Sequence, residues 1–307
     1  MDAFADVALF SLISKLGSMA AAAQELGVTP PVVSRRLAAL EKRLGVRLMN
    51  RTTRRISLTT EGEAYLLDGV RILEQLQALE HRIGRGSVQP QGTLRVSATL
   101  GFGRAYITPA LAKFARQHSQ VEVQMHLSDR PVNLVDQGFD VMVRFGELSD
   151  SRLTARLLAR NRRLLCASPV YLKRAGMPAS PRELGRHNCI FIREGDETFG
   201  TWQLRNGKEQ ESVKVRANLS TNDGASALAW ALEGQGILLR SQWDVASHIR
   251  AKRLVPILTE WNSPSADIYV VFQTTNQLPA KIRALVDLLV NEFEPYRRRG
   301  KEPFGAW

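Results

Sequence analysis

Residues 17–59 read GSMAAAAQELGVTPPVVSRRLAALEKRLGVRLMNRTTRRISLT, and this stretch decides what the first part of the chain forms. Ser18 is a good helix N-cap, and the alanine-rich residues 19–26 that follow it favour a helix. Gly27 is suited to a left-handed stop. Thr29 is the next N-cap, and two prolines fall in the first turn of a second helix, where a missing N–H costs little. The pattern therefore predicts two short helices joined by a tight turn.

The second helix is predicted to run to about Leu44 and to stop at Gly45. Its apolar residues recur at spacings of four, three and four, which gives one buried stripe made of Val33, Leu37, Leu40 and Leu44. The opposite face carries Ser34, Arg35 and Arg36. A helix fits the major groove of B-DNA, and in helix-turn-helix docking its first residues reach base edges. We therefore expect this polar face to lie open to solvent.

Residues 46–59 are predicted to form a basic hairpin after the second helix. Arginines stand there among β-forming and polar residues, and Thr52-Thr53 is a suitable turn between two short strands. Such a wing places arginines on phosphates or in an adjacent minor groove. Between Val28 and Leu58 eight Lys and Arg residues stand against one acid, Glu41. A small solvated helix pair with a charge run is the plainer alternative, but it does not explain the order of cap, glycine turn, proline start, apolar stripe and arginine wing.

The segment from Phe4 to about Glu61 resembles the winged helix-turn-helix of the LysR-type transcriptional regulators. The matching residues are Ser18, Ala20-Ala21-Ala22, Leu26, Thr29-Pro30, Val33-Ser34, Leu40-Glu41, Leu44-Gly45, Leu48, Arg51-Thr52-Thr53-Arg54, Leu58-Thr59 and Gly62. Pro31 departs from the small residue common there and removes a polar contact. The resemblance implies that the start of the second helix touches bases. With the first cap and the wing, the predicted DNA-binding set is Ser18, Thr29, Pro30, Pro31, Val32, Ser34, Arg35, Arg36, Arg51, Thr52, Arg54 and Arg55.

Composition bounds the class of protein. A chain of 307 residues implies more than one domain, and a net charge of +12 favours a polyanionic partner. The five histidines are scattered, and Cys166 and Cys189 stand in apolar runs without metal spacing. We therefore expect no metal, no cofactor and no catalytic residue. The N-terminus lacks a signal peptide, and no apolar run is long enough to span a bilayer, so we expect a cytoplasmic protein with no membrane partner.

Residues 60–83 are predicted to form a long helix that begins with an N-cap and an acidic first turn. Its apolar residues follow a four-three heptad spacing, and a solitary helix of this length needs a partner for that face. The favoured interpretation is a dimerisation arm that gives a homodimer or homotetramer, with contacts from Tyr65, Ile72, Leu76, Leu79 and Ile83. The alternative is a helix that lies on the second domain of its own chain. Residues 84–92, rich in Gly, Pro, Gln and Ser, are the predicted linker.

Strands and helices alternate beyond the linker. We expect strands at 93–98, 121–127 and 140–145, helices at 104–117 and near 132–137, and an extended stretch at 153–168. A second set follows, with a strand at 189–192, a hairpin region at 201–217, a helix at 224–233 and a strand at 237–239. A strand at 268–274 returns to the first lobe, and a helix at 279–293 closes the chain. Such alternation implies parallel sheets with flanking helices.

This second part resembles the two-lobed, periplasmic-binding-protein-like effector domain of LysR-type regulators. The segments that carry the likeness are LRVSATLGFGR at 94–104, Ser128-Asp129-Arg130, GFDVMVRFGEL at 138–148, LLCASPVYL at 164–172 and residues 221–236. The expected fold is multidomain: an all-α winged helix-turn-helix at 1–59, a linker helix and hinge at 60–91, and a two-lobed α/β domain at 92–295. Lobe I comprises 92–163 and 268–295, lobe II comprises 164–267, and 296–307 form a solvated basic tail.

A small molecule is expected where strands of such sheets end beside helix N-termini. Backbone N–H groups there favour an anion such as a carboxylate, and an arginine adds a fork. The predicted effector-binding residues are Thr99, Leu100, Gly101, Phe102, Ser128, Arg144, Phe199, Trp202, Thr221, Asn222 and Asp223. Alternatives remain open: Thr221 and Asp223 as ordinary caps, Arg144 paired with Glu147, and Phe199 and Trp202 as core. Asp129 and Asp223 would oppose an anion if they faced the cleft.

The resulting hypothesis is a sequence-specific transcriptional regulator controlled by a small carboxylate effector. Its expected partners are double-stranded promoter DNA, the effector, a second copy of itself and RNA polymerase. An architectural or repressor DNA-binding protein without an effector is the alternative. An enzyme is disfavoured because the chain lacks HExxH, GxSxG, a phosphate-binding glycine loop and a Cys/His pair. A transport receptor would explain residues 92–294 but not the head, and it would need an export signal.

Overall fold

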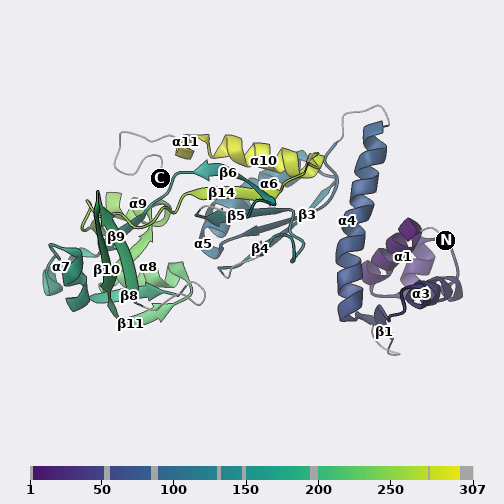
Figure 1. The fold of residues 1–307 in the computed structure, drawn as a ribbon, viewed down its shortest axis with the longest axis horizontal. Helices are drawn as coiled ribbons and strands as arrows, with labels where there is room; N and C mark the ends of the chain where they lie inside the picture. Colours follow the sequence, from purple (N-terminus) through teal and green to yellow (C-terminus); the bar gives the residue numbers. More distant parts are fainter. Residues whose placement is uncertain are drawn as a thin grey trace. The chain divides into compact units, whose positions relative to one another are not determined.

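The computed structural model describes residues 3–51, 56–83, 89–129, 133–146, 150–193, 200–275, 277–297 and 307 (Figure 1). At 51, 56, 74, 75 and 77–83 the structure describes the backbone and not the side chains. The chain divides into two compact units, Met1–Gln89 and Pro90–Trp307, and the division falls within the stretch predicted as linker.

The first unit is a helical head with a small hairpin. Its elements are α1 (Ala3–Leu16), α2 (Met19–Glu25), α3 (Pro30–Leu44), β1 (Met49–Arg51), β2 (Ile56–Leu58) and α4 (Thr60–Ile83). The predicted helix stops are confirmed, because Gly27 and Gly45 have φ of +64° and +74°. The Ser18 hydroxyl accepts a hydrogen bond from the Ala21 N–H at 3.3 Å, as expected of a cap.

The core of the head forms where α1, α2 and α3 meet. Val33, Leu37 and Leu40 are buried against Phe10 and Ile13, which confirms three residues of the predicted stripe. Leu44, the fourth, is exposed instead, because it stands in the last turn of α3, next to the Gly45 stop. Val28, between α2 and α3, is exposed as well.

The second unit contains two mixed five-stranded sheets. Lobe I has the order β4-β3-β5-β14-β6, with β3 (Gly92–Ala98), β4 (Val121–Leu127), β5 (Val141–Phe145), β6 (Leu153–Ala159) and β14 (Ile268–Gln273). Strand β3 is parallel to β4 and β5, whereas β14 is antiparallel to β5 and β6. The helices α6 (Thr108–Gln117) and α10 (Ala280–Glu292) pack on each other and on this sheet (Figure 1).

Lobe II has the strand order β11-β8-β12-β7-β13. Its strands are β7 (Arg163–Ala167), β8 (Asn188–Ile192), β11 (Arg216–Thr221), β12 (Ile237–Ser241) and β13 (Val255–Pro256). One face packs on α7 (Pro169–Ala175), the 3₁₀ helix Pro181–Arg186 and the hairpin of β9 (Thr201–Asn206) and β10 (Glu209–Lys214). The other face packs on α8 (Gly224–Leu232) and α9 (Gln242–Arg250).

Four expectations need correction. The sheets are mixed rather than parallel, because β14 and β7 enter their sheets from the opposite lobe without a crossover helix. The short helix expected near 132–137 is a turn over 134–138, which ends at Gly138 with φ of +68°. The helix expected at 104–117 begins earlier, as α5 (Leu100–Phe102), and passes through a π-helical turn, Gly103–Ile107, into α6. Trp307, expected in a solvated tail, is only 6% exposed.

The two crossovers between the lobes are held together by polar contacts. Arg160 forms an ion pair with Asp267 at 2.6 Å, and the Asn161 N–H donates to the same carboxylate at 2.8 Å. The Trp307 indole N–H donates to the Arg160 carbonyl at 2.8 Å, and its ring stacks on Tyr296 at 4.1 Å between centroids. These contacts bury Trp307 and brace the crossover at Arg160, which we call the hinge together with Asn161 and Asp267.

Candidate functional site

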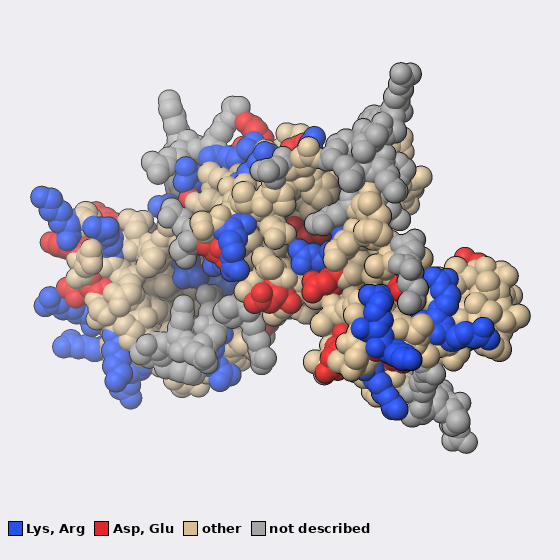
Figure 2. All heavy atoms as spheres, turned by 45° about the vertical axis from the view of Figure 1, so that its right-hand side comes forward, with Lys and Arg blue, Asp and Glu red and all other residues tan. Residues whose placement is uncertain are grey.

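The outer face of α3 is open to solvent. Arg35 and Arg36 are exposed and Ser34 is half-buried, while Thr29, Pro30, Pro31 and Val32 are exposed at the start of the helix. Ser18 is half-buried as the cap of α2. Figure 2 shows Lys and Arg side chains gathered on the visible face of the head. The face that a DNA groove requires is therefore accessible.

Two carboxylates set the pose of this face. Asp6 of α1 accepts a hydrogen bond from the Arg43 guanidinium at 3.0 Å and lies 3.9 Å from that of Arg36. Glu41 accepts hydrogen bonds from the backbone N–H groups of Leu48 and Met49 at 2.9 and 3.2 Å. The first contact fixes α3 to α1, and the second fixes the entry of the hairpin to α3.

The predicted DNA-binding residues of the wing stand at or beyond the edge of the described residues. Arg51 ends β1, and its side chain is not described. Thr52, Arg54 and Arg55 lie outside the described residues.

The residues predicted for dimerisation lie along α4. Near the start of the helix, the ring of Tyr65 packs edge-on against Phe10 at 5.5 Å between centroids, within the core of the head. Further along, Ile72 is 50% exposed and Leu76 is half-buried. The side chains of Leu79 and Ile83 are not described.

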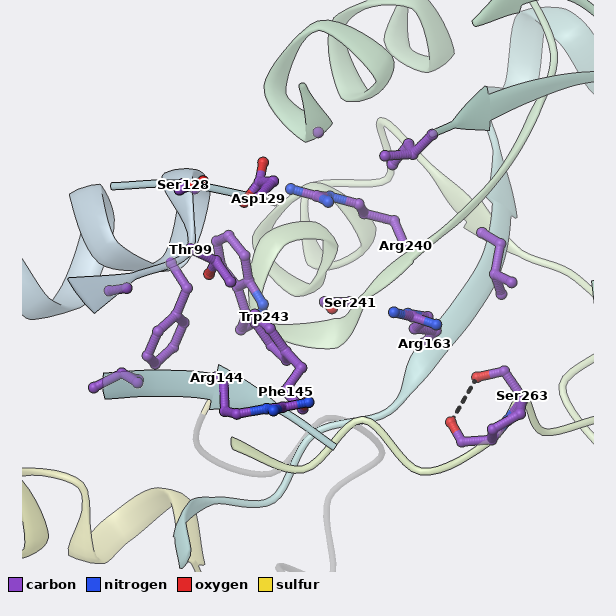
Figure 3. Close-up of a pocket in the computed structure, with 18 of the residues that line it drawn as sticks. Thr99, Ser128, Asp129, Arg144, Phe145, Arg163, Arg240, Ser241, Trp243 and Ser263 are labelled. Atoms are coloured by element: carbon purple, nitrogen blue, oxygen red, sulfur yellow. Dashed lines mark hydrogen bonds between the residues drawn. The ribbon is translucent and has the colours of Figure 1, made fainter. Parts of the chain in front are cut away.

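The second unit contains a cavity of about 940 Å³ between its lobes (Figure 3). This volume lies within the range of about 300–1,000 Å³ that small-molecule sites usually have. Six predicted residues line it: Thr99, Gly101, Phe102, Ser128, Arg144 and Trp202. Leu100 is not part of the lining, and its backbone N–H donates to the Asp129 carboxylate at 2.9 Å. Phe199 lies outside the described residues.

The predicted residues Thr221, Asn222 and Asp223 are not part of that lining either. Asp223 caps α8, accepting hydrogen bonds from the Ser226 hydroxyl at 2.7 Å and the Ser226 N–H at 2.9 Å. These bonds, the one from Ala225 and the charge of Arg104 lower the pKa of the Asp223 carboxyl. Thr221 accepts from the Asp223 N–H at 3.0 Å. The geometry matches the alternative of a helix cap for Asp223, whereas Thr221 bonds to the Asp223 N–H ahead of the helix.

Several lining residues were missed from the sequence, above all Arg163, Arg240, Ser241 and Trp243. Arg240 and Ser241 end strand β12, so the rule that located Thr99 and Ser128 would have found them too. Arg163 begins β7, and it pairs with Ser241 because β7 runs antiparallel to β12. If all strands were parallel, only residues at strand ends would line the cavity, so that expectation does not predict Arg163, which stands at a strand start.

The cavity is cationic. Its described lining residues include three arginines, Arg144, Arg163 and Arg240, and one acid, Asp129. Figure 3 shows Arg144 on a strand of one lobe and Arg163 and Arg240 on strands of the other. An anion between the lobes would be attracted from both sides.

Two cysteines lie buried in lobe II, on opposite faces of its sheet. Burial raises the pKa of both the Cys166 and Cys189 thiols to about 12. Within the described residues, no group of His, Cys, Asp and Glu is arranged to hold a metal ion. No helix in the described part of the chain is long and apolar enough to cross a membrane.

Comparison with known proteins matches both units. A family model described as the LysR substrate binding domain covers residues 87–294. Another, described as the bacterial regulatory helix-turn-helix protein of the lysR family, covers residues 4–63. The HTH-type transcriptional regulator DmlR of Escherichia coli is 40% identical over 288 residues, which are 94% of each chain. The E. coli activator TtdR is 39% identical over 273 residues, covering 89% of this chain and 88% of TtdR.

The same relationship is found among solved structures. CrgA, a LysR-type transcriptional regulator from Neisseria meningitidis, is 31% identical with a TM-score of 0.59, covering 94% of this chain and 98% of CrgA. The chain belongs to the LysR family of bacterial transcriptional regulators. This confirms the expected fold of a helix-turn-helix head and a two-lobed α/β domain, and a regulator rather than an enzyme.

Proposed function

We propose that this regulator is controlled by a small carboxylate that binds between the two lobes of its second unit. The observation that carries the proposal is the cationic cavity, to which both lobes contribute arginines. Arginine presents planar paired donors that match a carboxylate, and in a partly enclosed site such pairs are stronger than in open water. The names of the relatives DmlR and TtdR describe regulators and specify no ligand.

The proposed mechanism is a shift between two lobe poses. A ligand moves such an equilibrium only if its affinity for the two poses differs. A carboxylate that contacts Arg144 in lobe I and an arginine of lobe II favours the pose in which both reach it. The crossover segments near Asn161 and Asp267 are the places where a change of pose must be accommodated.

On the DNA side, we propose that the start of α3 and the wing contact promoter DNA in the cytoplasm. The contacts assigned to α3 and its preceding cap are Thr29, Pro30, Pro31, Val32, Ser34, Arg35 and Arg36. Ser18, Arg51, Thr52, Arg54 and Arg55 complete the set. Pairing through α4, with Ile72 half exposed, would place two heads on two half-sites. RNA polymerase is the proposed further partner when the protein is bound at a promoter.

The proposal is tested by combining a ligand screen with a DNA footprint. The full-length protein is screened by thermal shift against sodium salts of straight-chain mono- and dicarboxylates of two to six carbons and of benzoate. Any carboxylate that raises the melting temperature is then added to a DNase I footprint on a promoter fragment. We expect the footprint to change in extent or spacing. An unchanged melting temperature with every carboxylate, together with a normal footprint, would support a regulator without such an effector.

A further inference from the structure

Arg240 is a cation of the cavity that two neighbours hold in place. It is the second-last residue of β12, and its side chain is 13% exposed. Its Nε donates to the Asp244 carboxylate, in the first turn of α9, at 2.6 Å, and its guanidinium lies 5.5 Å from the centre of the Trp243 ring. The ion pair with Asp244 on one edge and the Trp243 ring on one face restrict rotation of the guanidinium. Less conformational entropy is therefore lost when this side chain binds a ligand.

Two glycines make room for this guanidinium. A Cβ built on Gly224, the first residue of α8, would lie 2.0–2.1 Å from Nη1, Nη2 and Cζ of Arg240. A Cβ on Gly101 of lobe I would lie 3.4 Å from Nη2 and 3.1 Å from Trp243 Cη2. Gly224 does not have a left-handed φ, so its backbone conformation does not require glycine. A side chain at 224 would therefore force the Arg240 guanidinium to shift out of that space.

The surroundings of this cation combine a helix N-terminus with a carboxylate. The partial positive charge at the start of α8 is offset by the carboxylate of its N-cap, Asp223, next to the Gly224 that the guanidinium contacts. The described part of the chain provides no hydrogen-bond acceptor for Nη1 or Nη2, since the ion pair with Asp244 runs through Nε. Both nitrogens border the cavity and remain accessible to solvent. An anion placed on these two nitrogens would accept charge-assisted hydrogen bonds from the guanidinium.

We propose that Arg240 is the group that binds the effector's carboxylate, and that Gly224 sets this specificity by leaving room for the guanidinium. The inference deepens the proposed function and rests on it. Arg144 and Arg163 then act as secondary charges. Figure 3 shows Arg240 on lobe II reaching toward Ser128 and Asp129 of lobe I, so a carboxylate bound there contacts the boundary between the lobes.

The test measures the Kd of any carboxylate that stabilises the wild type in the thermal-shift screen, by titration calorimetry on full-length variants. Arg240→Gln removes the guanidinium, and Gly224→Ala displaces it without removing the charge. Both should weaken binding about tenfold or more, the effect of losing charge-assisted hydrogen bonds. Because Gly224 is proposed to act only through the position of the Arg240 guanidinium, the double variant should bind no more weakly than Arg240→Gln alone.

Matched controls separate binding from folding. Gly185→Ala places a Cβ 3.6 Å from the nearest atom, an ordinary contact, and Arg182→Gln removes an exposed arginine paired with Glu211. Both should bind within twofold of wild type, and near-UV circular dichroism should show every variant folded. Arg240→Gln or Gly224→Ala binding within twofold of wild type would overturn the inference, and selective loss in Arg144→Gln would transfer the role to lobe I. If no carboxylate stabilises the wild type, the proposed function itself fails, and the inference fails with it.

Discussion

Single side chains in this regulator often act by holding a neighbour in place. Asp6, whose side chain is only 10% exposed, binds Arg43 and approaches Arg36, two cations of the helix expected to read DNA. The guanidinium of Arg36 therefore lies near a carboxylate within the head, whereas the side chain of Arg35, at the adjacent position, is exposed to solvent. Of these two arginines, Arg35 is the stronger candidate for a base contact.

The buried thiols give a prediction at this scale. Thiolate is the reactive form of cysteine, and a pKa of about 12 in place of 9 leaves about a thousandfold less of it near pH 8. We expect Cys166 and Cys189 to react with Ellman's reagent only on the timescale of unfolding. In 6 M guanidinium chloride both should react at once. Prompt reaction of either thiol in the native protein at pH 8 would contradict the structure.

Asp223 gives a second prediction, in which pH decides the outcome. Its carboxyl has a lowered pKa in the folded protein, so its stabilising effect is present above the unfolded pKa of about 3.9 and is lost as pH falls through the folded value. Asp223→Ala should lose about 0.5–2 kcal/mol of cap stability at pH 7. Asp223→Asn should differ from wild type at pH 7 and converge with it toward pH 3.

Urea denaturation followed by tryptophan fluorescence measures this effect. All five tryptophans stand between residues 202 and 307, so the signal reports the second unit alone. If the difference in free energy of unfolding between Asp223→Asn and wild type stays constant down to pH 3, the charge of the cap is not its cause.

At the scale of elements, the junction between the wing and α4 depends on a glycine. Thr59 accepts a hydrogen bond from the Gly62 N–H at 3.0 Å and donates to the Arg47 carbonyl at 2.7 Å. A Cβ at Gly62 would lie 2.0 Å from the backbone oxygen of Leu48. Backbone atoms cannot move aside as a side chain can, so this close approach ties α4 to the start of the hairpin.

Gly62→Ala is therefore expected to destabilise the head, although alanine normally stabilises a helix by about 1 kcal/mol relative to glycine. The expected loss is about 1–3 kcal/mol, the range for overpacking. It should appear as a lower urea midpoint by far-UV circular dichroism and as weaker DNA binding, with the tryptophan-reported transition unchanged. Gly185→Ala is the control. A midpoint equal to or above that of wild type would show that the junction relaxes freely.

Elements with a strong local signal were predictable, and elements defined by distant contacts were not. The ends of α2 and α3 follow from Ser18, Gly27 and Gly45, since caps and left-handed glycines act locally. The turn at 134–138 was mistaken for a helix because one helical turn and a short helix share the same local pattern. The direction of β14 depends on where the chain re-enters lobe I, which no local pattern contains.

The same division applies to the whole molecule and its cavity. Thr99 and Ser128 were found because the ends of parallel strands meet at one edge of a sheet. The binding role proposed for Arg240 depends on its contacts with Gly224, Trp243 and Asp244. The contact with Gly224 is made only in the folded chain, so no local sequence pattern indicates it. The burial of Trp307 was equally hidden, because the hinge that it braces joins segments more than a hundred residues apart.

At the scale of the whole molecule, α3 is the element proposed to read DNA. Protein–DNA affinity falls linearly with salt on a log–log scale, and one good bidentate base contact contributes about 1–3 kcal/mol of discrimination. The test selects the preferred DNA from a random library with the full-length protein and measures its binding by fluorescence anisotropy from 50 to 300 mM KCl. Arg35→Ala is compared with Arg182→Ala, an exposed arginine of lobe II.

We predict a selected site with two half-sites, steep salt dependence for the wild type, and unchanged binding by Arg182→Ala. Arg35→Ala should bind about tenfold more weakly and select with relaxed preference at one position of each half-site. If Arg35→Ala selects the same sequence with the affinity of the wild type, or if binding is insensitive to salt, α3 does not read DNA and the account is wrong.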